Sequence, residues 1–323
     1  MPHVSSQIIG HESQIEALKA DIFSDNVAHA YLFHGPAHLG KMTTALWFAQ
    51  ELLCSGLGAP ERLGAAHQID RLTHPDLFVL DQLWIEEVCE DWEMIARTSN
   101  VPQGHRQKSG ARTDTISIDD IRALHTRLHE KSLSRYRCCI IRSADRMLEN
   151  ASNVLLKILE EPPPGLVFIL TADSSTALLP TIVSRSRILA FRRVADRVLA
   201  PLLSTLADED RQFILSLAQG APGTATALCA DPDALRTHRI RQNAALSFWH
   251  GRSLQERLQH LDPLLERGEE SEYFLLHLAL ALRQHPSRNP QNTRALTELV
   301  AGLQTNAHRQ LLAQRFAMSS MCS

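Results

Sequence analysis

A glycine-containing loop near the N-terminus has the residue types and spacing of a phosphate-binding loop. Residues Gly35 to Lys41 fit the pattern G-x-x-x-x-G-K. In such a loop the backbone N–H groups surround phosphate oxygens and the lysine neutralises their charge. The loop follows an apolar, strand-like run at 30–34 and precedes a helical pattern at 43–54, which is the context that this chemistry requires. Gly35, Gly40 and Lys41 are therefore candidate phosphate-binding residues.

The residues that would hold Mg²⁺ are missing from this pattern. The position after the lysine requires a Ser or Thr hydroxyl, but it is Met42. Thr43 remains a candidate, but it lies about 100° further around the helix axis and does not simply replace that hydroxyl. The strand-like run at 138–141 should end in acidic residues, yet Arg142 and Ser143 follow it. Because a guanidinium repels a metal ion and stays charged, the sequence predicts no independent ATP hydrolysis and no metal site.

Composition places the chain among ordinary globular proteins. It has 323 residues, 44% of them hydrophobic, which allows two or three domains at roughly 150 residues each. The net charge of −3 lacks the basic excess of proteins that bind nucleic acid alone, so DNA contacts are expected to be local or shared. The six cysteines include no C-x-x-C pair, and no signal peptide or membrane-length apolar run is evident. We therefore expect a soluble, cytoplasmic protein.

The first 194 residues alternate between strand-like and helical patterns. Such alternation predicts an α/β domain with a parallel sheet that helices cover on both faces. Adjacent cysteines at 138 and 139 should point to opposite faces of that sheet. The expected strands are 30–34, 77–80, 138–141 and 166–171, and the expected helices are 15–23, 43–54, 121–128 and 151–161.

Beyond residue 194 the sequence predicts helices alone. Residues 195–232 carry two short helical patterns around a glycine-rich turn, and 233–323 read as a separate all-helical domain. The stretch at 83–115, acidic first and basic later, is expected to be a surface excursion of the first domain. The long helical segments of the last domain are expected at 233–250, 253–267, 271–284 and 293–316.

Two motifs carry a resemblance to a known family. The run L-L-K-I-L-E-E-P-P at 155–163 and the run L-P-T-I-V-S-R-S-R at 179–187 resemble bacterial clamp-loader subunits of the AAA+ class. The T-H-P-D run at 73–76 agrees with this resemblance. It implies a RecA-like AAA+ domain over 1–194, a small helical lid over 195–232, and a C-terminal helical collar over 233–323, through which subunits assemble.

The chain departs from that family at its zinc site and its lid. Family members usually carry four zinc-binding cysteines, but only Cys54 lies in that region, and His67 and His74 are weak helpers. A tetrahedral zinc site normally needs four Cys or His ligands, so we expect no zinc. Gly223 stands where an arginine would sense the γ-phosphate. These losses resemble the delta-prime type, which requires no cofactor, although the backbone cradle could still hold ATP or phosphate.

One chemically active group remains in the second motif. In this family its arginine projects into the ATP site of a neighbouring subunit, so Arg185 is the expected arginine finger in trans. The alternative is that Arg185 and Arg187 are solvated charges. The resemblance implies gamma/tau and delta subunits as partners, with the sliding clamp and primed DNA reached through the complex and no membrane partner. The competing function is an active AAA+ ATPase motor of the gamma/tau type.

Overall fold

The chain forms two compact units. The computed structural model describes residues 8–80, 115–128, 132–284 and 290–320. One unit comprises residues 1–201 and 220–223, and the other comprises 202–219 and 224–323. The expected excursion at 83–115 falls, except for Thr115, outside the described residues. The division into three domains, at 194 and 232, stays a prediction.

A five-stranded parallel sheet forms the centre of the first unit. Its strand order is β2-β3-β4-β1-β5, and every neighbouring pair is parallel. The strands are β1 (Ala30–His34), β2 (Leu77–Leu80), β3 (Arg137–Ile141), β4 (Leu166–Ala172) and β5 (Arg187–Ala190). This confirms the α/β class and the four expected strands. The sequence did not predict β5, because it is a short edge strand in which Leu189 is buried and Ile188 is 47% exposed.

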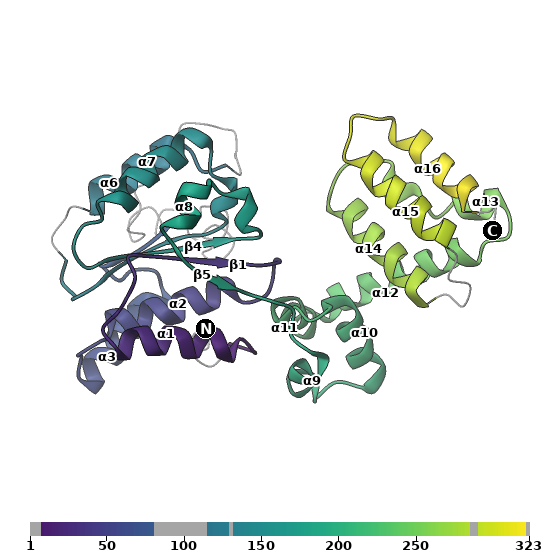
Figure 1. Cartoon of the computed structure of the whole chain (residues 1–323). Coiled ribbons are helices and arrows are strands. Elements are labelled where there is room, and N and C mark those ends of the chain that lie inside the picture. The colour runs from purple at the N-terminus through teal and green to yellow at the C-terminus, as the bar shows by residue number, and fades with distance from the viewer. Residues whose placement is uncertain (1–7, 81–114, 129–131, 285–289, 321–323) are drawn as a thin grey trace. The chain divides into compact units, whose positions relative to one another are not determined.

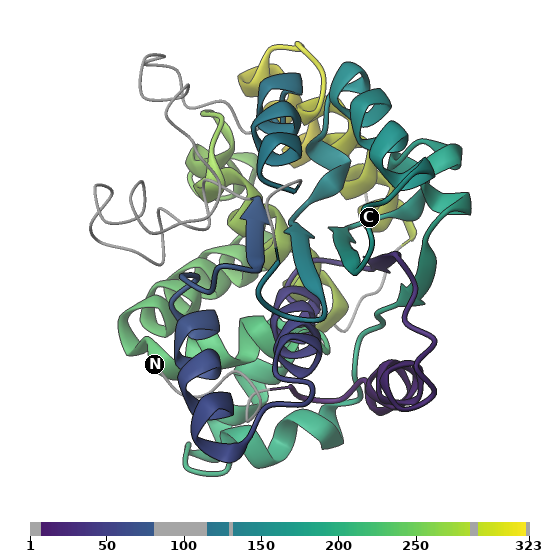
Figure 2. The same cartoon turned by 90° about the vertical axis from the view of Figure 1, so that its left-hand side faces the viewer.

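Helices cover both faces of this sheet (Figure 1), and the same layers are visible from the side in Figure 2. One face carries α1 (Glu12–Phe23), α2 (Lys41–Leu53) and α3 (Ala59–Asp70), and the other carries α6 (Ile118–Leu128), α7 (Glu149–Glu160) and α8 (Pro180–Ser184). Cys138 and Cys139 lie in the two separate apolar clusters, as expected, and burial raises the pKa of both thiols. The α3 helix had not been predicted, since its buried side is only Ala65, Ala66 and Ile69.

From residue 195 onward the described residues contain helices and no strand, as expected. The helices are α9 (Asp196–Leu199), α10 (Asp208–Ala218), α11 (Pro222–Ala230), α12 (Pro232–His250), α13 (Leu254–Leu258), α14 (Glu269–Gln284), α15 (Pro290–Leu303) and α16 (Arg309–Ser319). The single segments expected at 253–267 and 293–316 were both wrong, because the first is the short α13 followed by a 3-10 turn at Asp262–Leu264 and the second is two helices. Between them the Thr305 hydroxyl donates to the Gly302 carbonyl, at 2.7 Å, in place of helical continuation. None of the helices in the described ranges combines the length and apolar character that a bilayer span requires.

A buried histidine joins α12 to α14 in the second unit. The His277 side chain is fully buried; its Nδ1–H donates to Gln242 Oε1, at 2.8 Å, and its Nε2 accepts from His238 Nδ1–H, at 2.9 Å. Burial lowers the pKa of His277 to about 4, and the charges of His238 and Arg241 add to this, while Glu270 opposes it. The histidine is therefore neutral in the folded protein near neutral pH.

This histidine should make the second unit less stable in acid. His277 takes up a proton near pH 6.5 in the unfolded chain but only near pH 4 in the folded chain. Protonation therefore favours the unfolded state between these values, and the free energy of unfolding falls as the pH is lowered from above 6.5 toward 4. We expect the free energy of unfolding to drop by about 1–2 kcal/mol between pH 8 and pH 5 from this group. Urea unfolding of the full chain at both pH values measures it, and His277→Gln should flatten the dependence. An equally steep dependence in that variant would contradict the assignment.

Candidate functional site

The phosphate loop connects β1 to α2 at the carboxyl edge of the sheet. Gly35 has φ 146°, and a Cβ there would lie 2.1 Å from the Phe191 carbonyl oxygen, so the close approach to the chain after β5 requires glycine. Gly40 has φ 87° and precedes α2. The buried His11 ring donates from Nε2–H to the Leu39 carbonyl, at 2.9 Å, and burial lowers its pKa. The loop is therefore held by its neighbours in a fixed backbone conformation.

The loop lysine is bound to oxygen atoms of the protein itself. Lys41 Nζ donates to the carbonyls of Gly35 and of Pro36, the latter at 2.8 Å, and lies 2.9 Å from Asp173 Oδ1. Its side chain is 10% exposed, whereas that of Asp173 is 63% exposed. A phosphate entering this loop would have to compete with the Asp173 carboxylate for the lysine, and the two anions would repel each other.

The next residues of α2 give the loop no hydroxyl for a metal. Met42, at the position where Mg²⁺ chemistry needs Ser or Thr, packs against the apolar cluster between α2 and the sheet. Thr43 is half-buried, and among the described residues its hydroxyl has no hydrogen bond. The buried Thr44 hydroxyl instead donates to the Gly40 carbonyl, at 3.0 Å, within the first turn of the helix.

Beside the loop, the end of β3 presents a cation where a metal site needs carboxylates. β4 lies between β1 and β3, so the ends of these three strands meet at one edge of the sheet. Arg142 follows β3 there and is half-buried. Ser143 then adopts φ 51°, and its N–H donates to the Thr171 hydroxyl of β4, at 3.0 Å. Asp145, the next acid along the chain, lies beyond this in a 3-10 turn at Ala144–Arg146.

The turn at 220–223 lies directly against the phosphate loop. The Gly223 N–H donates to the His38 carbonyl, at 2.8 Å. A Cβ on Gly223 would lie 2.9 Å from that oxygen and 3.3 Å from the His38 Cα. Glycine thus allows the two backbones to meet, and any larger residue, arginine included, would require the loop to shift.

Two of the residues considered for zinc, Cys54 and His74, have contacts with other residues of the first unit. The Cys54 thiol is buried and lies 3.9 Å from the Arg62 carbonyl oxygen, and burial raises its pKa. The His74 Nδ1 accepts a hydrogen bond from the Asp76 N–H, at 3.2 Å. Within the described ranges, no three His, Cys, Asp or Glu side chains gather as metal ligands would. The expectation of no zinc stays a prediction.

The two arginines of the second motif differ in their surroundings. Arg185 follows α8, whose Ile182 is fully buried against the sheet. The Arg185 guanidinium donates to the Thr181 carbonyl, at 3.2 Å, and to Glu160 Oε1, at 2.9 Å. Its side chain is 37% exposed. Arg187 begins β5 and forms an ion pair with the buried Asp21. The Arg187 side chain is 39% exposed, so the two arginines are equally accessible and differ in their partners: Arg187 pairs with a buried carboxylate and Arg185 with a half-exposed one.

Three acidic residues with defined contacts were not predicted from the sequence, and only the first of them lies beside the phosphate loop. Asp173 follows β4, so the rule that parallel strands end at one edge places it near Lys41. Glu160 belongs to the motif at 155–163, but its spacing alone gives it no role. Asp76 is buried and accepts the N–H groups of Leu133, at 3.0 Å, and Ser134, at 2.7 Å, so it fixes the approach to β3.

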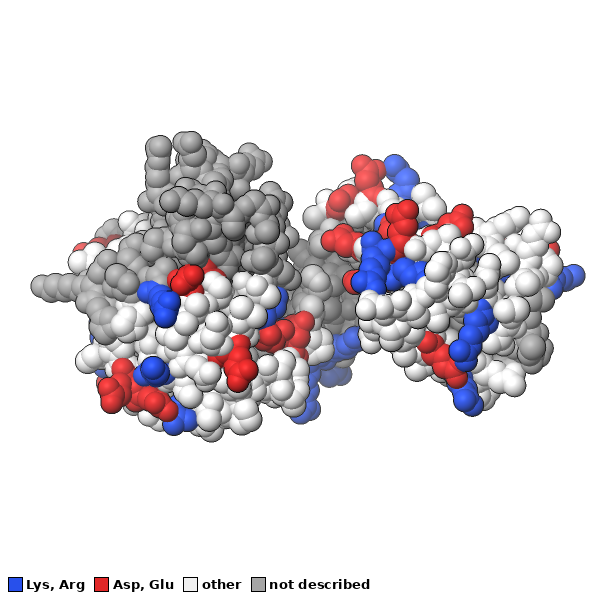
Figure 3. Space-filling model, turned by 90° about the horizontal axis from the view of Figure 1, so that it is seen from above, with Lys and Arg blue, Asp and Glu red and all other residues white. Residues whose placement is uncertain are grey.

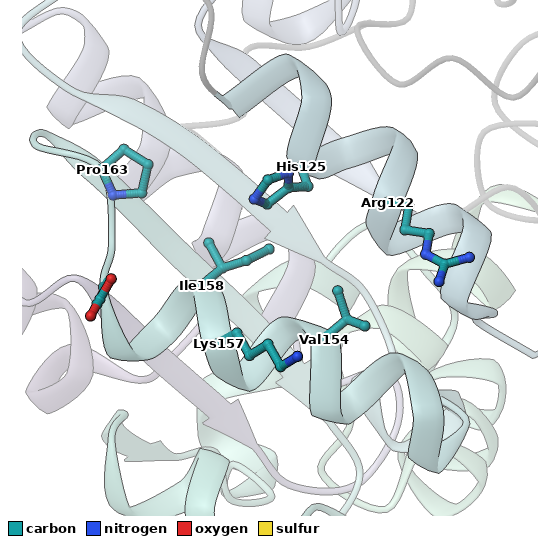
Figure 4. A pocket seen from close by; sticks show the side chains of 7 residues that line it. Arg122, His125, Val154, Lys157, Ile158 and Pro163 are labelled. Atoms are coloured by element: carbon teal, nitrogen blue, oxygen red, sulfur yellow. The ribbon is translucent and has the colours of Figure 1, made fainter.

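A pocket of about 470 Å³ opens between α6 and α7 on the other face of the sheet. Figure 4 shows Arg122 and His125 projecting from α6 and Lys157 from α7, with Glu161 completing the charged lining. On the face seen in Figure 3, acidic and basic side chains of the described residues are interspersed. The described side chains visible there form no extended basic patch of the kind that binds DNA alone in either unit.

Comparison with known proteins agrees with this geometry. The family model described as DNA polymerase III, delta subunit, matches residues 10–195, which contain the sheet, the phosphate loop and Arg185. A gamma/tau subunit of DNA polymerase III from Mycobacterium bovis is 28% identical over 65% of the chain, a match that spans 32% of that relative. A delta' subunit of DNA polymerase III from Pseudomonas aeruginosa is 33% identical over 49% of the chain and 41% of the relative.

A solved structure shares the fold. The gamma subunit-related protein of DNA polymerase III from Thermotoga maritima aligns with a TM-score of 0.54 and 17% identity, covering 95% of this chain and 98% of that one. The expected parallel α/β sheet domain with helical regions after it is thereby confirmed as the fold. The chain belongs to the DNA polymerase III, delta subunit, family.

Proposed function

We propose that this chain is a delta-prime-type subunit of the DNA polymerase III clamp loader that hydrolyses no ATP itself. It would help load the sliding clamp onto primed DNA. The observation that carries the proposal is the pair of changes at the carboxyl edge of the sheet, where Met42 and Arg142 stand in place of a hydroxyl and a carboxylate. ATP hydrolysis needs Mg²⁺ at that edge, and neither residue binds it.

The contacts of the loop lysine support the same proposal. Lys41 is held by Asp173 and by two loop carbonyls, and Gly223 packs against the loop backbone at His38. A bound triphosphate would have to displace the Asp173 carboxylate without help from a metal ion. The protein would therefore require no nucleotide as a cofactor, and the loop would serve as a structural element.

The active contribution of this chain would be the Arg185 guanidinium. An arginine supplied in trans stabilises the charge that gathers on a phosphoryl group during its transfer. Arg185 lies at the end of a short helix anchored in the core, is partly exposed, and belongs to the motif that the resemblance assigns to this role. The ATP would be held by a neighbouring gamma/tau subunit.

The proposed partners follow from the relatives in Mycobacterium bovis and Pseudomonas aeruginosa, although the chain matches only 32% and 41% of the length of these two proteins. Their names place them in DNA polymerase III, so gamma/tau and delta subunits are the proposed partners. The clamp and primed DNA would be reached through the complex, and the replication role would place the chain in the cytoplasm. The helices of residues 233–323 would form the collar.

A motor subunit of the gamma/tau type is the second candidate. The similarity to gamma/tau relatives over 65% of the chain favours it. Met42, Arg142 and Gly223 all speak against it, since each removes a group that ATP turnover uses.

Reconstitution tests the proposal. The purified chain should join gamma/tau and delta subunits in one assembly, detected by native mass measurement. DNA-stimulated ATP turnover should then be greater with this chain than in a mixture of the other subunits without it. Failure to join any such assembly would contradict the proposal.

A further inference from the structure

The α7 helix ends in an acidic residue that contacts the proposed arginine finger. Glu160 is the last residue of α7, where the helix dipole disfavours a negative charge. Its Oε1 accepts a hydrogen bond from Arg185 Nη2, at 2.9 Å. The side chains are 46% and 37% exposed, so a pair like this adds little to the stability of the fold. What the pair with Glu160 does determine is the position of the Arg185 guanidinium.

The guanidinium is held from two sides and remains able to bind an anion. Nη1 donates to the Thr181 carbonyl, at 3.2 Å, and Nη2 donates to Glu160. Within the described part of the chain these are its only hydrogen-bond partners, so other N–H groups of the fork are left for a phosphate. The Thr181 carbonyl belongs to α8, whose Ile182 is buried in the core, and Glu160 belongs to α7. Two separate elements therefore fix the direction of one flexible side chain.

We propose that Glu160 is the positioning residue of Arg185, holding the guanidinium ready for the phosphate of a neighbouring subunit. This inference rests on the proposed function of Arg185. A free arginine side chain samples many rotamers, and ordering it beforehand removes that entropy loss from the reaction step. Glu160 touches no phosphate itself. Its loss should therefore lower turnover at the served site without weakening ATP binding by the neighbour.

The test compares three variants of the full chain in the reconstituted assembly, with MgATP and primed DNA. Glu160→Ala should lower kcat at the served site by about 10-fold and leave KM for ATP unchanged. Glu160→Gln keeps an oxygen that accepts from Arg185 and should restore most of the rate. Glu161→Ala removes the neighbouring carboxylate, which has no described contact with Arg185, and should behave as the unaltered chain. Thermal unfolding checks that all three fold.

A double-variant cycle separates this inference from the function on which it rests. If Glu160 acts through Arg185, Glu160→Ala should have no further effect on turnover once Arg185 is alanine. If Arg185→Ala slows turnover but Glu160→Ala does not, the positioning role is overturned and the arginine finger stands. If Glu160→Ala slows turnover equally in both backgrounds, Glu160 acts elsewhere and the inference is wrong. If Arg185→Ala has no effect, the proposed function itself fails.

Discussion

Arg185→Ala should slow ATP hydrolysis at one site of the reconstituted assembly by about 10³-fold, the lower end of what arginine fingers contribute in GTPases. The reason is that the variant removes the only charge that this chain is proposed to offer a neighbour's phosphate. The steady-state rate of the assembly would fall only by the part that this one site contributes. A rapid-quench measurement of the first turnover therefore detects the loss better. When primed DNA is added, the amplitude of the burst of hydrolysis should be smaller by the amount of ATP bound at the served site.

Stability and chemistry can be separated in this experiment. Arg185 is 37% exposed and pairs with a half-exposed Glu160, so the chain should lose under about 1 kcal/mol of folding free energy. Arg185→Lys keeps the charge but not the planar fork, and it should recover only part of the rate. A burst of unchanged size in Arg185→Ala would count against the trans role.

Asp76→Ala should cause the largest loss of stability. The Asp76 carboxylate is 1% exposed and accepts hydrogen bonds from the N–H groups of Leu133 and Ser134 and from the Ser132 hydroxyl, at 3.1 Å. It also lies 3.5 Å from the buried Arg137 guanidinium. Removing one member of a buried ion pair typically lowers the free energy of unfolding by about 3–5 kcal/mol, because the other charge is left buried without a partner. We expect a decrease of that size in the free energy of unfolding, measured with urea.

A nearby exposed pair provides the control for Asp76. Asp25 and Arg135 form a 2.6 Å ion pair in which both side chains are 60% exposed. Asp25→Asn suits the left-handed backbone of this residue, at φ 53°, and should change the free energy of unfolding far less than Asp76→Ala does, because exposed pairs are well solvated. Equal losses in the two variants would mean that burial is not what makes Asp76 important.

The sequence predicted the elements that position the site because their patterns are local. Four strands and the helix after the phosphate loop were recognisable from short apolar runs, from glycines and from the lysine at position 41. The edge strand β5 and the α3 helix bury too few apolar side chains to give such a pattern. At the break between α15 and α16 both the N–H and the hydroxyl of Thr305 donate to the Gly302 carbonyl, a local turn that amphipathic spacing does not reveal.

The contacts that define the site depend on the tertiary structure. Met42 and Arg142 could be interpreted from position alone, since the motif specifies which chemistry each position must supply. The link of Lys41 to Asp173, over more than a hundred residues, requires the order of the strands. The same holds for Glu160 and Arg185, which only the packing of α8 on α7 brings together.

The central claim is tested most directly by ATP turnover of the purified chain alone, with and without Mg²⁺. The account predicts no magnesium-dependent hydrolysis above the level of a Lys41→Ala variant, which removes the loop cation. Magnesium-dependent hydrolysis that the Lys41→Ala variant abolishes would show a working ATP site in this chain and contradict the account.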